Sequence, residues 1–152
     1  MTFAAKETDM EYIFSADFQP DQDGGFIVTF PDVPEAITFG DDLADAHTSA
    51  VEALGLALRG YLVLGRPLPT PATKRNGLVE VPVNAATALK LAVVEAFNAS
   101  GISKSDLARR LGKAEGEARR ILDPDHPTKV QALEAALAAL GKEIVISVRD
   151  AA

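Results

Sequence analysis

Apolar residues change their spacing near residue 41, and this change determines which elements the first half of the chain can form. In the stretch "MEYIFSADF", one face carries the alternate residues Tyr12, Phe14, Ala16 and Phe18. Alternation with period two is typical of a β-strand with one buried face. After Asp41 or Asp42, either of which can cap a helix, the apolar residues recur at helical spacing: Leu43, Ala46, Ala50, Leu54, Leu58 and Tyr61. The pattern predicts a helix that is long enough to cover one face of a small sheet.

Turn and breaker residues divide the rest of this region into short strands. The Pro, Asp and Gly residues of "QPDQDGG" predict a turn before the strand "FIVTF", so the first two strands form a hairpin. Pro31 and Pro34 separate this hairpin from a third strand, "AITFG". After the loop "RPLPTPATKRNG", the run "LVEVPV" predicts a fourth strand, and Pro82 favours its placement at a sheet edge. Gly55 and Gly60 within the helix predict that it packs closely against the sheet. The predicted order of elements in this half is β-β-β-α-β.

Helical spacing and start signals predict four helices in the second half of the chain. Asn84 can cap the first of these helices, and Ser103 with Asp106 forms a capping box at the start of the second. The third is a short helix that ends "RRIL", and Thr128 with Gln131 forms a further capping box before the fourth. This half is therefore expected to be an α-helical bundle.

Charge and aromatic residues are divided unevenly between the two halves. Residues 1–83 contain 13 Asp and Glu residues and 5 Lys and Arg residues, a net charge of −8. Residues 84–152 contain 9 acidic and 10 basic residues, a net charge of +1, and only one of the nine Phe and Tyr residues. The division predicts an α+β fold in two small domains, residues 1–83 and residues 84–152.

Composition excludes several classes of protein. With no Cys, the chain has neither disulfides nor thiolate metal sites. No apolar run approaches the roughly 20 residues that span a bilayer, and the start "MTFAAKETDM" lacks the pattern of a signal peptide, so a cytoplasmic protein is expected. His47 and His126 are isolated in the sequence, and we expect no metal site and no cofactor.

Residues 104–122 contain six basic and three acidic residues, although the chain as a whole has a net charge of −7. Here "LARRLG" is followed by a second short helix, and this arrangement resembles Cro-repressor-type DNA-binding domains with a helix-turn-helix. In that resemblance the helix near residues 115–122 enters the major groove. The predicted phosphate contacts are basic: Lys104, Arg109, Arg110, Lys113, Arg119 and Arg120. A solvated basic helix face is the simpler alternative.

The start of the predicted recognition helix departs from the pattern of that class. The pattern favours Val-Ser before the helix and Gln, Ser and Thr at its start, whereas this chain has Lys113-Ala114 and then Glu115, Gly116 and Glu117. Ala114 cannot cap the helix, a loss of about 1 kcal/mol. Glu115 and Glu117 are included among the predicted DNA-contacting residues because a carboxylate can accept from cytosine N4, although beside phosphates it repels.

The order of motifs along the whole chain resembles one family. The segment "GGFIVTFPDVPEAITFGDDLADAHTSAVEALGLAL" is similar to the N-terminal domain of HicB-type antitoxins, whose hallmarks are Pro-Asp-x-Pro-Gly, a short strand ending in Gly-Asp, and a Glu-Ala-rich helix. The tail "DPDHPTKVQALEAALAALGKEIVISV" is similar to the helix-turn-helix subgroup. The resemblance covers residues 11–149, with a departure at Glu35-Ala36, where the family usually has Gly.

This resemblance implies a partial RNase H-like domain without catalysis, followed by a DNA-binding domain. It implies two activities: binding and neutralising a HicA-like mRNA-cleaving toxin, and repressing the operon that encodes both proteins. An acidic domain suits an RNA-binding partner, which should be basic. The predicted toxin contacts are acidic residues of the hairpin and helix start: Asp17, Asp21, Asp23, Asp41 and Asp42. Solvation of turns and caps explains each of these residues singly about as well.

The closing run "EIVISV", residues 143–148, predicts a strand with no obvious partner in its own domain. Its backbone groups need hydrogen-bond partners. Pairing with the same strand of a second copy would give a twofold homodimer, or a tetramer of two such dimers. A dimer would place two recognition helices about 34 Å apart, one turn of DNA.

Two other classes of function are considered. A nuclease needs several converging carboxylates, but only Asp17 on the first strand and Glu52 on the helix are candidates, so no catalytic residue is assigned. The second alternative is a free-standing helix-turn-helix transcription regulator whose N-terminal domain senses a ligand or a protein. A short basic reading frame beside this gene would favour the antitoxin.

Overall fold

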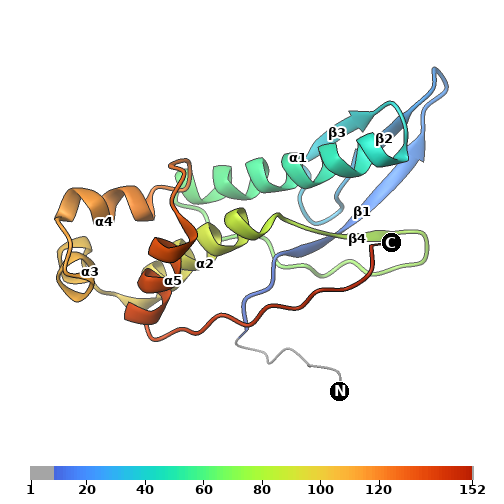
Figure 1. Cartoon of the computed structure of the whole chain (residues 1–152). Coiled ribbons are helices and arrows are strands. Elements are labelled where there is room, and N and C mark those ends of the chain that lie inside the picture. Colours follow the sequence, from blue (N-terminus) through green and yellow to red (C-terminus); the bar gives the residue numbers. More distant parts are fainter. Residues whose placement is uncertain (1–8, 152) are drawn as a thin grey trace.

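The computed structural model describes residues 9–151 and shows a mixed α+β protein with a four-stranded antiparallel sheet (Figure 1). The elements in chain order are β1 (Ile13–Pro20), β2 (Phe26–Thr29), β3 (Ile37–Gly40), α1 (Leu43–Val63), β4 (Val79–Pro82), α2 (Ala85–Ser100), α3 (Lys104–Leu111), α4 (Glu115–Leu122) and α5 (Val130–Ala139). The predicted order β-β-β-α-β followed by four helices is confirmed.

The sheet is built from a meander of three strands plus one strand added after the helix. Its order is β3-β2-β1-β4, and every neighbouring pair is antiparallel. The β1–β2 hairpin turns through Gly24 and Gly25, both at positive φ, which glycine adopts without strain. As Pro82 predicted, β4 lies at an edge, so the missing N–H of the proline interrupts no central ladder.

Helix α1 covers one face of the sheet, and no helix of residues 9–151 covers the other (Figure 1). The alternation of the strands decides which side chains face α1. Phe14 of β1 stands opposite Val81 of β4, and Phe18 of β1 stands opposite Val28 of β2, so these residues share the helix-facing side. They pack with the buried residues of α1, including Leu54. Each fully buried side chain of this size contributes about 1.5 to 3 kcal/mol.

Of the two caps that the sequence allowed, Asp41 and Asp42, it is Asp42 that caps α1. The Asp42 carboxylate accepts from the backbone N–H of Asp45 at 2.8 Å. The helix then lies so close to the end of β3 that a Cβ on Gly40 would be 2.1 Å from the backbone nitrogen of Ala46. Only glycine fits this junction.

The helices α2 to α5 enclose a second hydrophobic cluster, around Val93, Leu107 and Leu133. Helix α2 belongs to both clusters, because its Leu91 is buried in the first and its Val93 in the second. In Figure 1, α3, α4 and α5 lie at the opposite end of the molecule from the β1–β2 hairpin. Two predicted helix starts are confirmed, the caps at Asn84 and Ser103, and α2 and α3 end at Gly101 and Gly112, both in the left-handed conformation.

Two local predictions are wrong. The capping box of Thr128 and Gln131 does not form: the N-cap of α5 is Lys129, and it makes no side-chain cap. The hydroxyl of Thr128 instead accepts from Lys90, a partner distant in sequence. Packing against the sheet also does not explain the two glycines of α1. A Cβ on Gly55 would meet Thr87 of α2, and one on Gly60 would meet nothing within 4 Å.

The predicted strand at residues 143–148 is absent from the single chain. Residues 142–151 run without secondary structure from the end of α5 back toward β4 (Figure 1). A strand needs a ladder of backbone hydrogen bonds with a neighbour, and this segment has no such ladder in the described chain. Its large apolar side chains are largely in solvent, Val148 being 91% exposed.

Candidate interaction surfaces

Helices α3 and α4, with the connection at residues 112–114, form the basic surface that the sequence predicted. Ser103 and Asp106 make a complete capping box at the start of α3, and Gly112 ends the helix in the left-handed conformation. Leu107 and Ala118, one from each helix, are buried. Burial of one face of each helix fixes the pair in place and leaves the charged faces in solvent.

All eight side chains predicted to contact DNA are exposed: Lys104, Arg109, Arg110, Lys113, Glu115, Glu117, Arg119 and Arg120. Three basic residues among them are paired with acidic residues one helical turn away. Arg109 pairs with Asp106, Lys113 with Glu117 at 3.5 Å, and Arg119 with Glu115 at 2.9 Å. Such exposed pairs contribute only a few tenths of a kcal/mol, but in each pair the carboxylate offsets one positive charge that could otherwise be offered to a partner.

The other three basic residues differ in their contacts. Arg110 donates from Nη1 to the carbonyl oxygen of Ala139, at the end of α5, at 3.1 Å. This bond satisfies a carbonyl that the helix itself leaves without a partner, so Arg110 also has a structural role. In the part of the chain that the structure describes, no ion pair includes Lys104 or Arg120.

Helix α4 begins without a side-chain cap, as the sequence indicated. Ala114 is its N-cap and makes no side-chain hydrogen bond. Glu115 and Glu117 lie in the first turn, where carboxylates favourably meet the positive end of the helix dipole. These two residues therefore stabilise the helix start, while they also place negative charge on the predicted DNA-facing helix.

The end of α4 is held by a buried lysine that sequence analysis did not single out. The ammonium of Lys90 on α2 donates to the carbonyl oxygens of Arg120 and Ile121, at 3.2 and 2.8 Å, and to the hydroxyl of Thr128 at 2.6 Å. Burial lowers the pKa of Lys90 to about 8, against the attraction of Asp123. A lone Lys on an apolar helix face was the available signal in the sequence.

The structure gathers most of the predicted toxin-contacting residues at one end of the sheet. Pro20, Phe26 and Gly40 stand in one row across β1, β2 and β3, so the hairpin turn and the start of α1 lie at the same sheet end. Four of the predicted residues lie in these two connections: Asp21, Asp23, Asp41 and Asp42. The Asp42 side chain is already used as the cap of α1.

Asp17 lies apart from these four, within β1. Its register partner is Thr29, and its carboxylate accepts from the Gln19 side chain at 2.7 Å. Because Phe18 faces α1, its neighbour Asp17 faces the uncovered side of the sheet. Asp17 is therefore placed to touch a partner on that side.

Asp32, within the "PDVP" turn, anchors the long loop between α1 and β4. Its carboxylate accepts from the Thr73 hydroxyl at 2.6 Å and from the backbone N–H groups of Thr73 and Ala72 at 2.8 and 3.0 Å. Burial acts to raise the pKa of Asp32, but these hydrogen bonds outweigh it and lower the pKa below its usual value. The aspartate of this turn thus has a structural role.

Glu35, at the position where the sequence departs from the family pattern, forms a small polar cluster. It accepts from the hydroxyl of Tyr61 at 2.6 Å, and the guanidinium of Arg66 lies over the Tyr61 ring, 4.3 Å from its centre. The hydrogen bond from Tyr61 lowers the pKa of Glu35. The departure therefore adds a contact between the turn and the end of α1.

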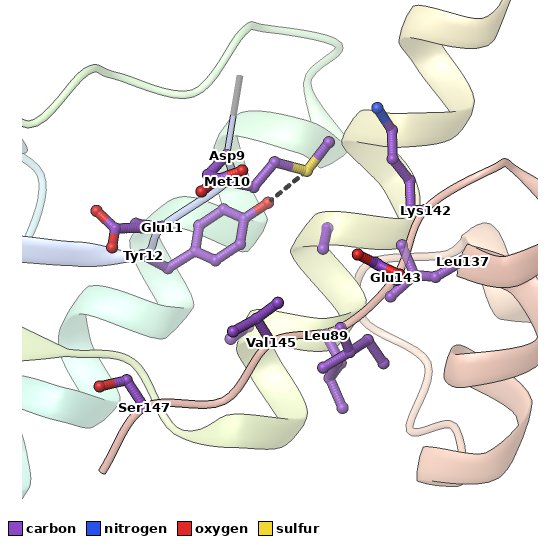
Figure 2. Close-up of a pocket in the computed structure, with 13 residues that line it drawn as sticks. Asp9, Met10, Glu11, Tyr12, Leu89, Leu137, Lys142, Glu143, Val145 and Ser147 are labelled. Atoms are coloured by element: carbon purple, nitrogen blue, oxygen red, sulfur yellow. Dashed lines mark hydrogen bonds between the residues drawn. The ribbon is translucent and has the colours of Figure 1, made fainter. Parts of the chain in front are cut away.

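A pocket of about 260 Å³ lies where residues 9–12, α2 and the C-terminal segment meet. Figure 2 shows Tyr12 on one side of this pocket and Leu137 of α5 on the other. The hydroxyl of Tyr12 donates to Glu95 of α2 at 2.6 Å, and burial together with this bond raises the pKa of Tyr12. Val145 and Ser147 of the C-terminal segment also line the pocket.

Neither a metal-ligand cluster nor a membrane-spanning helix occurs among residues 9–151. No three His, Asp or Glu side chains in this range are grouped as metal ligands would be. No helix in the same range combines the length and the apolar character that crossing a membrane requires.

Comparison with known proteins finds similar chains of one kind. The family profile described as "HicB_like antitoxin of bacterial toxin-antitoxin system" matches residues 13–92. The chain is 39% identical over 127 residues to Antitoxin HicB of Escherichia coli (strain K12), covering 82% of this chain and 91% of that protein. It is 33% identical over 142 residues to Antitoxin HicB of Pseudomonas fluorescens (strain Pf0-1), covering 93% and 95%. Antitoxin HicB 2 of Photorhabdus laumondii is 40% identical over 120 residues, covering 79% of this chain and 85% of that protein.

Proposed function

Because the chain belongs to the HicB-like antitoxin family of bacterial toxin-antitoxin systems, we propose that it binds and neutralises a HicA-like mRNA-cleaving toxin and represses its own operon. It acts as a binding protein rather than an enzyme. The observation that supports this proposal best is the position of the family match. Residues 13–92 contain the whole sheet, α1 and half of α2, so the segment that the family profile matches is the acidic one.

Charge supports the assignment of toxin binding to this part. An RNA-cleaving protein holds its substrate through basic residues that pair with phosphates. An acidic partner is steered toward such a surface and, once bound, keeps RNA away from it. The proposed domain of residues 1–83, with a partial RNase H-like fold, supplies that acidic partner.

DNA binding is assigned to the proposed helix-turn-helix domain of residues 84–152. Helices α3 and α4 present exposed basic side chains, and the short connection between them suits a helix-turn-helix. In this proposal α4 enters the major groove, and the side chains of Lys104 and Arg120, which have no ion pair in the described chain, contact phosphates. Operator DNA is therefore the second proposed partner.

A second copy of the chain is the third proposed partner. The C-terminal segment has the alternating apolar sequence of a strand, yet it makes no ladder within one chain. Pairing with the same segment of another copy would give it that ladder and would form a twofold dimer, as a two-half-site operator requires.

Co-expression tests the antitoxin function. A HicA-like toxin from the same host genome should arrest growth when expressed alone, and this chain should restore growth and co-purify with the toxin. Gel shifts with the upstream region of its gene should show a complex that weakens as salt rises. DNA binding without toxin capture would instead indicate the free-standing regulator, and toxin capture without DNA binding would remove the repressor role alone.

A further inference from the structure

The face of the sheet that α1 leaves uncovered carries a contiguous group of exposed apolar side chains. Ile27, Ile37 and Phe39 on this face are 40%, 64% and 45% exposed. Ile27 stands directly opposite Phe39, and Ile37 lies two residues from Phe39 on the same strand and therefore on the same face. Such a cluster of large apolar side chains on a sheet face is typical of an interaction site.

The surroundings of this cluster are acidic. From residue 7 to residue 58 the sequence has twelve Asp and Glu residues and no Lys or Arg. None of the four strands contains a basic residue. Asp17 of β1 and Glu80 of β4 lie on the uncovered face, because their neighbours Phe18 and Val81 face α1.

We infer that this uncovered face, centred on Ile27, Ile37 and Phe39, is the surface that binds the toxin. The inference rests on the proposed antitoxin function and names its contact surface. A protein surface that binds single-stranded RNA combines basic residues for phosphates with apolar or aromatic side chains on which bases stack. An apolar centre with acidic surroundings is the complement of such a surface in both respects.

The chain itself shows this face accepting a cation. Arg149 of the C-terminal segment lies 3.7 Å from the carboxylate of Glu80, at the β4 edge, with both side chains about half exposed. A second copy of the chain is a poorer occupant. Two copies meeting through this face would bring carboxylates together with no basic residue of the strands to pair with them, and Arg149 of each copy is already paired with Glu80 of its own chain, so this contact is unfavourable.

The exposed apolar residues of α1 provide a matched comparison. Leu56 of α1 and Leu64, the C-cap residue of α1, are 62% and 72% exposed, in the same part of the chain but not on the sheet. They are eight residues apart, about 12 Å along a helix at 1.5 Å per residue. They therefore do not form a compact cluster like that of the sheet face.

The test compares two double variants that change no charge and replace only exposed side chains. The sheet variant is Ile37→Ser with Phe39→Ser, and the control is Leu56→Ser with Leu64→Ser. The probe is the purified HicA-like toxin of the same host, made inactive by substitution so that it can be produced. We expect the sheet variant to bind at least about tenfold more weakly, mainly through faster dissociation, and the control to bind as wild type does.

A charge variant adds a second readout. Asp17→Asn should slow the association with toxin about two- to threefold at low salt. At high salt the association rate should not change, because salt screens the electrostatic attraction between the two proteins. Wild-type affinity in the sheet variant, or an equal loss in the control, would overturn the inference. If the sheet variant sediments differently from wild type in the absence of toxin, then this face binds a second copy of the chain instead. If wild type binds no toxin, the proposed function itself is wrong.

Discussion

Gly40 lies at the junction of β3 and α1, where the backbone of the helix leaves no room for a side chain. A Cβ at this position would lie 2.1 Å from the nitrogen and 2.3 Å from the Cα of Ala46. Since both are backbone atoms, the whole start of α1 would have to move. We expect Gly40→Ala to lower the free energy of unfolding by about 2 to 3 kcal/mol, measured by urea denaturation.

Gly60 provides the control for this substitution. It lies inside α1, within the same residues 1–83, at a helical position where a Cβ would meet nothing within 4 Å. Gly60→Ala should leave stability unchanged or raise it by up to about 1 kcal/mol, because alanine favours the helix. Equal effects of the two substitutions would contradict the steric explanation of the Gly40 junction.

Lys90 is the buried charge on which the end of α4 depends. Lys90→Met keeps a similar shape but removes the donor that serves the carbonyls of Arg120 and Ile121. An unsatisfied buried polar group costs about 1 to 3 kcal/mol, and we expect a loss of about 2 kcal/mol near neutral pH. Thermal or urea unfolding would measure this loss, and an unchanged midpoint would show that the contacts contribute nothing.

The same lysine predicts a dependence on pH with a definite sign. The pKa of Lys90 is about 8 in the folded chain, against 10.5 for an exposed lysine. The charged groups around it are Asp123, which faces it, and Arg59, Asp125 and His126, which line the adjoining pocket. Between these values the unfolded chain binds more protons, so this residue makes the stability rise as pH increases. The difference in free energy of unfolding, wild type minus Lys90→Met, should therefore increase from pH 8 toward pH 10.

At the scale of single elements, α4 combines two opposing features. Glu115 and Glu117 favour the helix start, yet they pair with Arg119 and Lys113 and so reduce the basic charge offered to DNA. Replacing both with Gln would release these two cations for phosphate contacts. We expect tighter binding to the upstream DNA and a salt dependence steeper by about one to two units in log–log slope.

Fluorescence anisotropy over a series of salt concentrations would measure this change. Glu134→Gln on α5, also an exposed glutamate, is the control and should change the slope much less. If the double variant binds DNA with the wild-type slope, then α4 does not contact phosphates.

The elements that were predictable from sequence are those that local chemistry determines. Ser103 with Asp106 signals a helix start because both partners of the capping box lie within one turn. Thr128 was assigned the same role wrongly, because its hydroxyl accepts from Lys90, which the fold brings from another helix. The exposure of the charged side chains of α3 and α4 was predictable, but the use of Arg110 at the end of α5 was not.

At the scale of the whole molecule, α2 joins the sheet to the helical bundle. Leu91 is buried among the sheet side chains, Val93 is buried among the helices, and Ala92 packs against both clusters. Tyr12, just before β1, donates to Glu95 on the same helix. The change in charge near residue 84 predicted two domains, but the sequence did not indicate that one helix would contribute to both hydrophobic clusters. Local periodicity identifies an apolar face and says nothing about which partner covers each part of it.

The C-terminal segment is the part of the molecule for which we propose a second copy of the chain as partner. Ile146 and Val148 are 80% and 91% exposed in the single chain, so replacing both with Ser removes no buried contact. If this segment pairs with its copy, the double variant should shift the chain from dimer to monomer in sedimentation. It should also weaken binding to a two-half-site operator about tenfold or more, because each half-site is then bound separately.

The same variant should keep its toxin affinity, because the proposed toxin surface lies on the sheet. Deletion of residues 143–152 should have the same effect as the double variant on oligomeric state. If both altered chains remain dimers, the contact between copies lies elsewhere, and the alternating apolar sequence of this segment must serve the pocket beside Tyr12 instead. If both become monomers that unfold at the wild-type midpoint, the strand predicted at residues 143–148 exists only in the dimer. Such a result would explain why the segment has the sequence pattern of a strand but forms no strand in a single chain.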